Sequence, residues 1–275
     1  MLKEPFHVAV PTAFFEDESL NIQGTIDHIK DLYKHGVTSV LVSGSTGEQH
    51  SLSLKEKLEM IGRLASEEDL MNKMEIIFGV SSVRQKEAEA LAKKIRTTKI
   101  PGMMLGYPPY VLPTQEEAVA YTKTMIHLSQ KPTILYNNPK RTGFDLSVNS
   151  VIELSQLELV IGLKEAGNKE KVAIIKNKLD RSHFYFYAGG EAELEKKVSL
   201  GFNRLSSIAG NISPIEISQW FHHMLTNQEI TDQVRAKIEA ILQPIYDGSP
   251  LVNLKNSINQ KGINMGICRR PLGNI

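Results

Sequence analysis

The sequence predicts an α/β protein that folds as a (β/α)8 barrel, or TIM barrel, with a C-terminal helical appendage. Eight short apolar runs alternate with stretches of helical spacing over the first three quarters of the 275 residues. An open doubly wound sheet is the competing interpretation, but no glycine lies between Val8 and Phe15, where such a sheet carries its phosphate-binding loop. After the eighth run only helical patterns follow. We therefore expect the barrel at residues 1–211 and the helical region at 212–275.

The predicted strands are short runs rich in valine, isoleucine, leucine and aromatic residues, as expected of strands buried on both faces. They are Val8 to Pro11, Ser39 to Ser43, Glu75 to Gly79, Gly102 to Leu105, Thr133 to Tyr136, Leu159 to Lys164, Phe184 to Ala188 and Arg204 to Ile208.

The predicted helices repeat apolar residues every three or four positions. Between the strands they are Ile22 to His35, Leu54 to Ala65, Arg84 to Thr97, Gln115 to Ser129, Val148 to Leu157, Asn168 to Leu179 and Glu191 to Leu200. Pro214 to Leu225, Asp232 to Tyr246 and Pro250 to Gly262 form the appendage.

Composition excludes several classes of function. Lysine and arginine (32) nearly balance aspartate and glutamate (31), so the net charge of +1 provides no basic field for nucleic acid or an anionic membrane. The start of the chain does not resemble a signal peptide, and no apolar run is long enough for a membrane helix. The single cysteine, Cys268, favours a reducing compartment, and we expect a cytoplasmic protein.

Polar residues follow several predicted strands, at the end where barrel enzymes build their sites. Gly44 to Glu48 offers two hydroxyls and backbone amides between glycines, which suits a small carboxylate, although a plain turn has the same composition. Tyr136 ends the fifth strand, where an aromatic side chain also serves packing. Arg141 can bind a carboxylate with its guanidinium, but most exposed arginines have no specific partner.

Lys164 closes the apolar run Leu159 to Leu163. Burial at the barrel mouth would disfavour its charged form and free a neutral amine to attack a carbonyl carbon as a Schiff-base nucleophile. A strand-end lysine that extends its ammonium to solvent is the alternative.

Taken together, these motifs resemble the dihydrodipicolinate synthase and N-acetylneuraminate lyase family of pyruvate-dependent class I aldolases. The resemblance runs from Val8-Ala9-Val10-Pro11-Thr12 through the Gly44 to Glu48 loop, the stretch Tyr136 to Gly143 and Gly162-Leu163-Lys164-Glu165-Ala166, to Ser249-Pro250 and Arg270-Pro271-Leu272.

The resemblance implies a role for each matching residue. Lys164 matches the Schiff-base lysine, Tyr136 the proton-carrying tyrosine and Ser45 the relay hydroxyl. Tyr110 matches a tyrosine that reaches a neighbouring subunit's site, which implies a homodimer or homotetramer. Arg141 matches the arginine that receives the aldehyde's carboxylate. The predicted substrate-binding residues are Thr46, Gly47, Arg141, Gly189 and Ser206.

The resemblance implies that the substrates are a keto acid and an aldehyde, and that neither metal nor organic cofactor is needed because the lysine imine is the electron sink. Condensation of pyruvate with aspartate semialdehyde is the first hypothesis. Cleavage of a 2-keto-3-deoxy sugar acid, or of an N-acetylneuraminate-type substrate, is the second, and a non-catalytic keto-acid-binding paralog is the third. Pro109, Leu54 and Lys57 replace residues found in some synthases, so lysine inhibition is not supported.

Overall fold

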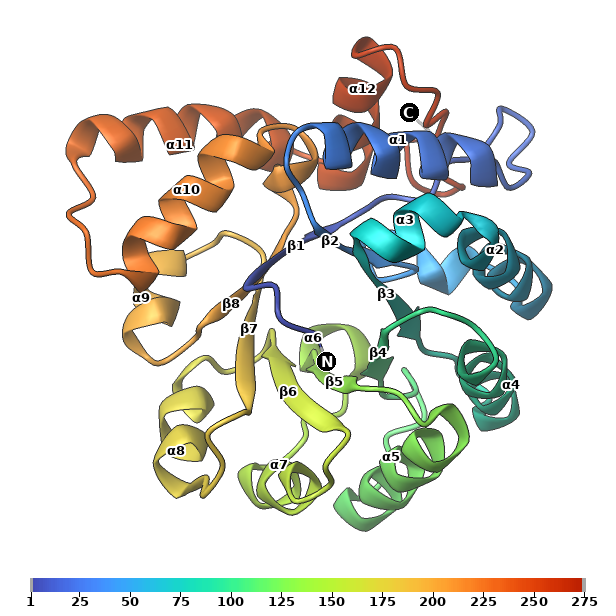
Figure 1. Cartoon of the computed structure of the whole chain (residues 1–275), viewed down its shortest axis with the longest axis vertical. Helices are drawn as coiled ribbons and strands as arrows, with labels where there is room; N and C mark the ends of the chain where they lie inside the picture. The colour runs from blue at the N-terminus through green and yellow to red at the C-terminus, as the bar shows by residue number, and fades with distance from the viewer. Residues whose placement is uncertain (1, 274–275) are drawn as a thin grey trace. The chain divides into compact units, whose positions relative to one another are not determined.

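Eight strands follow one another in chain order, and their order is that of a closed barrel. The structure is a computed structural model that describes residues 2–273. All eight predicted strands are present, so the predicted (β/α)8 barrel is confirmed (Figure 1). They are β1 (Phe6–Ala9), β2 (Ser39–Val42), β3 (Glu75–Val80), β4 (Gly102–Gly106), β5 (Thr133–Asn137), β6 (Val160–Glu165), β7 (Tyr185–Gly189) and β8 (Arg204–Ser207).

Helices occupy the predicted positions between and after the strands, and the C-terminal helices are confirmed. They are α1 (Ile22–Lys34), α2 (Leu54–Ser66), α3 (Glu68–Lys73), α4 (Gln85–Arg96), α5 (Gln115–Ser129), α6 (Pro139–Thr142), α7 (Val148–Ser155), α8 (Glu170–Lys178), α9 (Leu194–Ser199), α10 (Pro214–Leu225), α11 (Asp232–Tyr246) and α12 (Pro250–Gln260). Short 3-10 turns span Gln49–Ser51 and Ala209–Asn211. The sequence patterns did not predict α3 or α6.

Local side-chain hydrogen bonds define where several helices begin. Ser53 and Glu56 form a reciprocal capping box at the start of α2, and Thr114 and Glu117 form another at the start of α5. Pro139 supplies the first residue of α6, where its missing N–H costs no hydrogen bond. The starts of α2, α5 and α6 are therefore defined by residues that the local sequence supplies.

The chain divides into two compact units. One comprises residues 2–5 and 75–206, and the other comprises residues 6–74 and 207–273. In the first unit, each strand from β3 to β8 pairs in parallel with the next, and α4, α5, α7 and α8 lie outside these strands (Figure 1). In the second, β1 pairs with β2, and α11 packs against α10 and α12. The domain boundary predicted at residue 211 stays a prediction.

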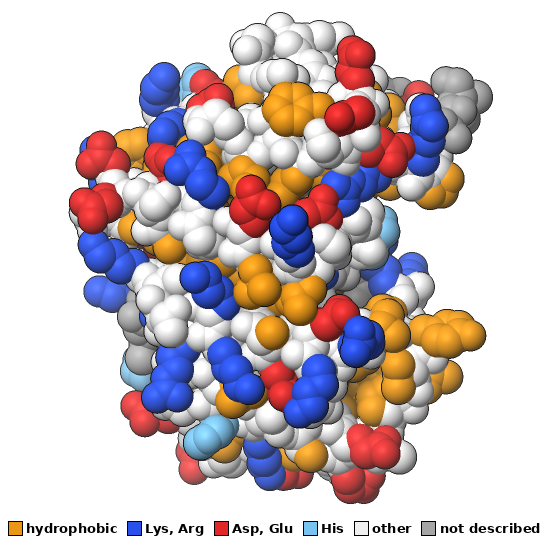
Figure 2. Space-filling model, turned by 90° about the vertical axis from the view of Figure 1, so that its right-hand side faces the viewer, with side chains coloured by type: hydrophobic (Ala, Val, Ile, Leu, Met, Phe, Trp, Pro, Cys, Tyr) orange, Lys and Arg blue, Asp and Glu red, His pale blue; other side chains and the backbone are white. Residues whose placement is uncertain are grey.

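Surface charges of both signs are interspersed on the face that Figure 2 shows, in agreement with the near-zero net charge. Among residues 2–273, no helix has the length and apolar character needed to cross a membrane.

The buried side chain of Asn211 connects β1, α1 and the turn after β8 in the second unit. The Asn211 side chain donates to the carbonyls of Ala9 and Ile208 at 2.9 and 2.8 Å, and its Oδ1 lies 2.8 Å from Nε2 of His28. Burial of the imidazole lowers the pKa of His28 from 6.5 to about 4, although the hydrogen bond to Asn211 acts in the opposite direction.

This pKa predicts an acid-dependent loss of stability. Between pH 6.5 and pH 4 the unfolded chain binds a proton at His28 that the folded protein does not, so the free energy of unfolding falls as the pH is lowered through this window. The His28 contribution to this fall should be at most about 3 kcal/mol. Urea titrations of His28→Gln should show a correspondingly shallower pH dependence, whereas His127→Gln, at an exposed histidine, should follow the wild type. Equal slopes in all three proteins would contradict the assignment.

Candidate active site

Lys164 is the centre of the candidate site in the first unit. It is the fifth residue of β6 and pairs in register with Tyr136 of β5 and Tyr187 of β7. Its side chain is packed among neighbouring residues, which leave only 8% of the residue exposed. A Cβ atom on Gly189 would lie 3.2 Å from Cε of Lys164, so glycine at the end of β7 leaves the space that the lysine side chain occupies.

The Lys164 amine contacts a hydroxyl and an aromatic ring. Nζ donates a hydrogen bond to Oγ of Ser206 at 2.8 Å and lies 4.9 Å from the centre of the Tyr136 ring. Burial lowers the pKa of the Lys164 ammonium from 10.5. Tyr136 and Glu191 nearby favour the charged form, and the positive charge of Arg141 disfavours it. Because desolvation is the largest of these effects, the site increases the fraction of the neutral, nucleophilic amine.

Tyr136 is oriented by a residue just beyond its own strand. Its hydroxyl accepts a hydrogen bond of 2.7 Å from Nδ2 of Asn138, which is itself buried. Asn138 is also the residue immediately before α6, and its carbonyl accepts from the N–H groups of Arg141 and Thr142. The start of this short helix therefore fixes the Tyr136 hydroxyl, and Arg141 extends from the same helix with an exposed side chain.

Tyr110 lies outside this buried group. Its residue is 91% exposed, and it sits in a loop with the neighbouring apolar residues Val111 and Leu112, which are also exposed. The loop is anchored, because the Tyr110 N–H donates to the carbonyl of Thr142 at 3.2 Å and the backbone of Tyr110 adopts a positive φ of 76°. The predicted relay role of Tyr110 would thus depend on a second subunit.

The Gly44 to Glu48 loop belongs to the second unit and directly follows β2. Thr46 and Gly47 are buried, and Ser45 is half-buried. The Thr12 hydroxyl donates to the carbonyl of Gly47 at 2.6 Å, and the N–H of Glu48 donates to the carbonyl of Ser45 at 3.2 Å. The loop is therefore a closed turn whose backbone is held by internal hydrogen bonds and by Thr12.

The structure brings together four of the predicted residues in the first unit, Lys164, Tyr136, Ser206 and Gly189, and three in the second, Ser45, Thr46 and Gly47. It also shows polar residues that sequence reasoning did not single out. Asn138 orients Tyr136, and Glu191, two residues beyond the end of β7, is buried close enough to Lys164 to favour its charge. The Asn-Asn-Pro and Gly-Gly-Glu sequences were the available signals for them.

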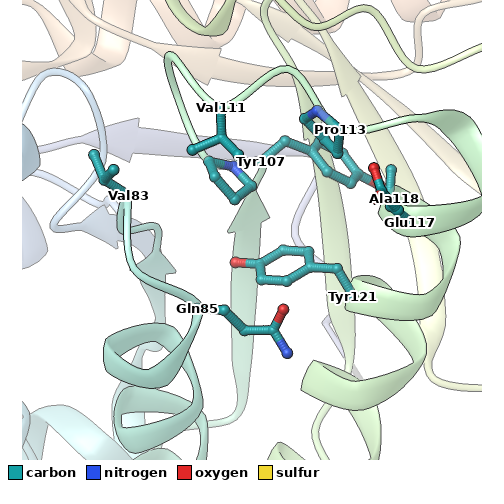
Figure 3. Close-up of a pocket in the computed structure, with 9 residues that line it drawn as sticks. Val83, Gln85, Tyr107, Val111, Pro113, Glu117, Ala118 and Tyr121 are labelled. Atoms are coloured by element: carbon teal, nitrogen blue, oxygen red, sulfur yellow. The ribbon is translucent and has the colours of Figure 1, made fainter.

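A separate cavity of about 370 Å³ lies in the first unit between α4 and α5 (Figure 3). Val83, Tyr107, Val111 and Tyr121 line it. Its two tyrosine hydroxyls are hydrogen-bonded inside the protein, Tyr107 to Thr122 at 3.0 Å and Tyr121 to the carbonyl of Gly106 at 3.3 Å. This cavity contains none of the predicted catalytic residues.

No cluster of three or more His, Cys, Asp or Glu side chains that could hold a metal ion occurs within residues 2–273. A parallel barrel that presents a buried lysine, with a depressed pKa, near the carboxyl end of a strand has the arrangement of an imine-forming enzyme of the class I aldolase type.

Comparisons with known proteins identify the family. The model of the dihydrodipicolinate synthetase family matches residues 4–275. A 4-hydroxy-tetrahydrodipicolinate synthase from Methanococcoides burtonii is 29% identical over 270 residues, which are 97% of this chain and 91% of that protein. One from Oceanobacillus iheyensis is 26% identical over 267 residues, 96% and 89% of the two chains. The chain therefore belongs to the dihydrodipicolinate synthetase family, and it is an enzyme of the class I aldolase type.

Solved structures share the fold. Dihydrodipicolinate synthase from Aquifex aeolicus superimposes with a TM-score of 0.90 at 22% identity, covering 98% of this chain and 92% of that chain. A variant of the 2-keto-3-deoxygluconate aldolase from Sulfolobus solfataricus superimposes with a TM-score of 0.80 at 20% identity, covering 98% and 90%. The same fold thus occurs in a synthase and in an aldolase, so the fold alone does not define the substrate.

Proposed function

We propose that this enzyme condenses pyruvate with aspartate semialdehyde, as a 4-hydroxy-tetrahydrodipicolinate synthase. The observation that carries the proposal is the buried Lys164 amine, which donates to Ser206 and lies over Tyr136. The family and the names of its relatives support the synthase activity, and the choice of pyruvate rests on the family resemblance of the site residues.

In the proposed reaction the neutral amine of Lys164 attacks the keto carbon of pyruvate, and loss of water gives an imine. The protonated imine then accepts the electrons released when the methyl carbon loses a proton, and an enamine results. Attack of the enamine carbon on the aldehyde forms the new carbon–carbon bond, and water or the substrate amine releases the product from Lys164. These steps require neither a metal nor an organic cofactor.

The proton transfers are assigned to the hydroxyl groups. Tyr136 carries protons to and from the bound keto acid, since its hydroxyl is already oriented by Asn138. Ser45 and Tyr110 complete the relay in the roles that the resemblance gives them. Because Tyr110 is 91% exposed beside Val111 and Leu112, we propose that a second copy of the chain covers this loop in a homodimer.

The substrate carboxylates are assigned to two positions. Thr46, Gly47 and the loop amides hold the carboxylate of pyruvate, while Arg141 receives the carboxylate of the aldehyde. Gly189 and Ser206 line the space around the lysine.

Cleavage of a 2-keto-3-deoxy sugar acid is the second candidate. Serine at position 45 suits that activity slightly better than the synthase activity, while Arg141 suits it less well. Assays of pyruvate release from sugar acids, set against consumption of pyruvate with aspartate semialdehyde, separate the two.

Borohydride reduction in the presence of pyruvate should add a pyruvate-sized mass to the wild type but not to Lys164→Ala. Borohydride converts an imine to a stable amine, and the Lys164 amine is the group that forms the imine in the proposed reaction. The matched control is Lys131→Ala, since Lys131 is another partly buried lysine with a lowered pKa, and it precedes β5. Intact-protein mass spectrometry should find the adduct in this control. A folded wild type without the adduct would reject the aldolase mechanism and favour a non-catalytic paralog.

Substitution Arg141→Ala should raise the KM for aspartate semialdehyde about ten- to a hundredfold, the loss expected for a hydrogen-bonded charge pair. The yield of the borohydride-trapped pyruvate adduct should stay close to that of the wild type. Lys140→Ala, at the exposed neighbouring residue of α6, is the control and should change neither quantity. If Arg141→Ala reduced both measurements equally, Arg141 would have no specific role with the aldehyde.

A further inference from the structure

A fully buried ion pair lies beside the Gly44 to Glu48 loop, and the proposed reaction does not use it. Nζ of Lys255, on α12, is 2.6 Å from Oε1 of Glu48, and the two side chains are 1% and 0% exposed. Glu48 is the last residue of the loop that contains Ser45 and Thr46. All of these residues belong to the second compact unit.

The C-terminal segment binds the same carboxylate. The N–H of Arg269 donates to Oε2 of Glu48 at 2.9 Å, and Nζ of Lys255 also donates to the carbonyl of Ile267 at 2.6 Å. The Arg269 guanidinium donates to the carbonyl of Ser51 at 2.7 Å and forms an ion pair with Glu56. The C-terminal segment thus contacts Glu48, just before the 3-10 turn Gln49–Ser51, and Glu56, beyond this turn.

Phe14 completes the contact. The Lys255 amine lies 4.5 Å and the Arg269 guanidinium 4.2 Å from the centre of its ring, at cation–π distance. The backbone approach is equally close, because the Phe14 N–H donates to the carbonyl of Met265 at 3.1 Å and a Cβ on Gly266 would lie 1.7 Å from the carbonyl oxygen of Phe14. Only glycine fits at position 266.

Stability alone does not account for this arrangement. Desolvation of two charges offsets most of their attraction, so an apolar pair of similar volume would stabilise the fold about as well. The charged groups do fix the direction of the Glu48 side chain, because the Lys255 ammonium pairs with Oε1 and the Arg269 N–H donates to Oε2. Glu48 itself has a left-handed backbone with a φ of 49°. Its N–H donates to the carbonyl of Ser45, so its position determines the closure of the loop.

We propose that Lys255 and Arg269 are positioning residues that hold the Gly44 to Glu48 loop, through the Glu48 carboxylate, in the shape that receives the carboxylate of pyruvate. The inference rests on the proposed function, in which Thr46 and the loop amides bind that carboxylate. Neither residue touches the substrate. Their effect should therefore appear only with substrates that carry a carboxylate next to the carbonyl group.

The test compares borohydride trapping of pyruvate with trapping of acetaldehyde, which forms an imine but has no carboxylate. In Lys255→Met the pyruvate concentration for half-maximal trapping should rise about tenfold, the order expected when a binding group shifts by less than 1 Å. The concentration dependence for acetaldehyde should stay within about twofold of the wild type. Lys255→Arg, which retains a charge for Glu48, should recover part of the pyruvate response.

Lys261→Met is the matched control. Lys261 follows the end of the same helix and donates to a backbone carbonyl, that of Ile212, at 2.8 Å. It has no hydrogen bond or ion pair with the loop within the described part of the chain. This variant should bind pyruvate as the wild type does. If Lys255→Met does not fold, as judged by circular dichroism, Glu48→Gln, which keeps the shape of the side chain, takes its place with the same expected result.

The outcomes are distinct. An unchanged pyruvate response in folded Lys255→Met, or an equal loss for pyruvate and acetaldehyde, would overturn the positioning role while leaving the proposed function intact. Absence of any pyruvate adduct in the wild type would instead reject the proposed function, and the positioning role would fall with it.

Discussion

The removal of one ammonium group from water is the constraint on which the candidate site depends. Lys164 forms part of a completely buried strand, and burial is the largest cause of its lowered pKa. Water is replaced by the Ser206 hydroxyl and the Tyr136 ring, and desolvation outweighs the effect by which Tyr136 favours the charged form. A carboxylate in direct contact would have stabilised the charged form. The glycine at position 189 provides the necessary space.

In the second unit the buried lysine, Lys255, is paired with a carboxylate. There, two charges are buried as an ion pair, and the Lys255 ammonium at Oε1 and the Arg269 N–H at Oε2 define the position of the Glu48 carboxylate. Burial lowers the pKa of the Lys255 ammonium, but the Glu48 carboxylate next to it acts against this shift. The neighbouring Cys268 thiol has its pKa raised by burial to about 11, which makes it a poor nucleophile at neutral pH. The buried Lys164 amine thus lies against a hydroxyl and an aromatic ring, whereas the buried Lys255 ammonium is paired with a carboxylate.

Much of the fold could be predicted because local sequence determines it. The apolar runs mark all eight strands and the helical spacing marks most helices, and topology alone places a residue near the end of a strand, such as Lys164, at the carboxyl end of the barrel. The sequence analysis missed helix α6 because its four residues, which begin with Pro139, are too few to show a helical period. Contacts between distant segments could not be predicted from local patterns either. Arg269 and Glu48 are 221 residues apart, and nothing in the sequence around either residue indicates that they pair.

The protonation of Lys164 in the free enzyme tests the central claim most directly. A pH titration of side-chain-labelled lysine by NMR, with the Lys164 signal assigned by its absence from Lys164→Arg, measures the midpoint at this one residue. Because burial lowers the pKa of the Lys164 ammonium, its midpoint should lie clearly below 10.5. A Lys164 midpoint at or above 10.5 would show that burial does not control its charge, and would contradict the account of how the amine becomes a nucleophile.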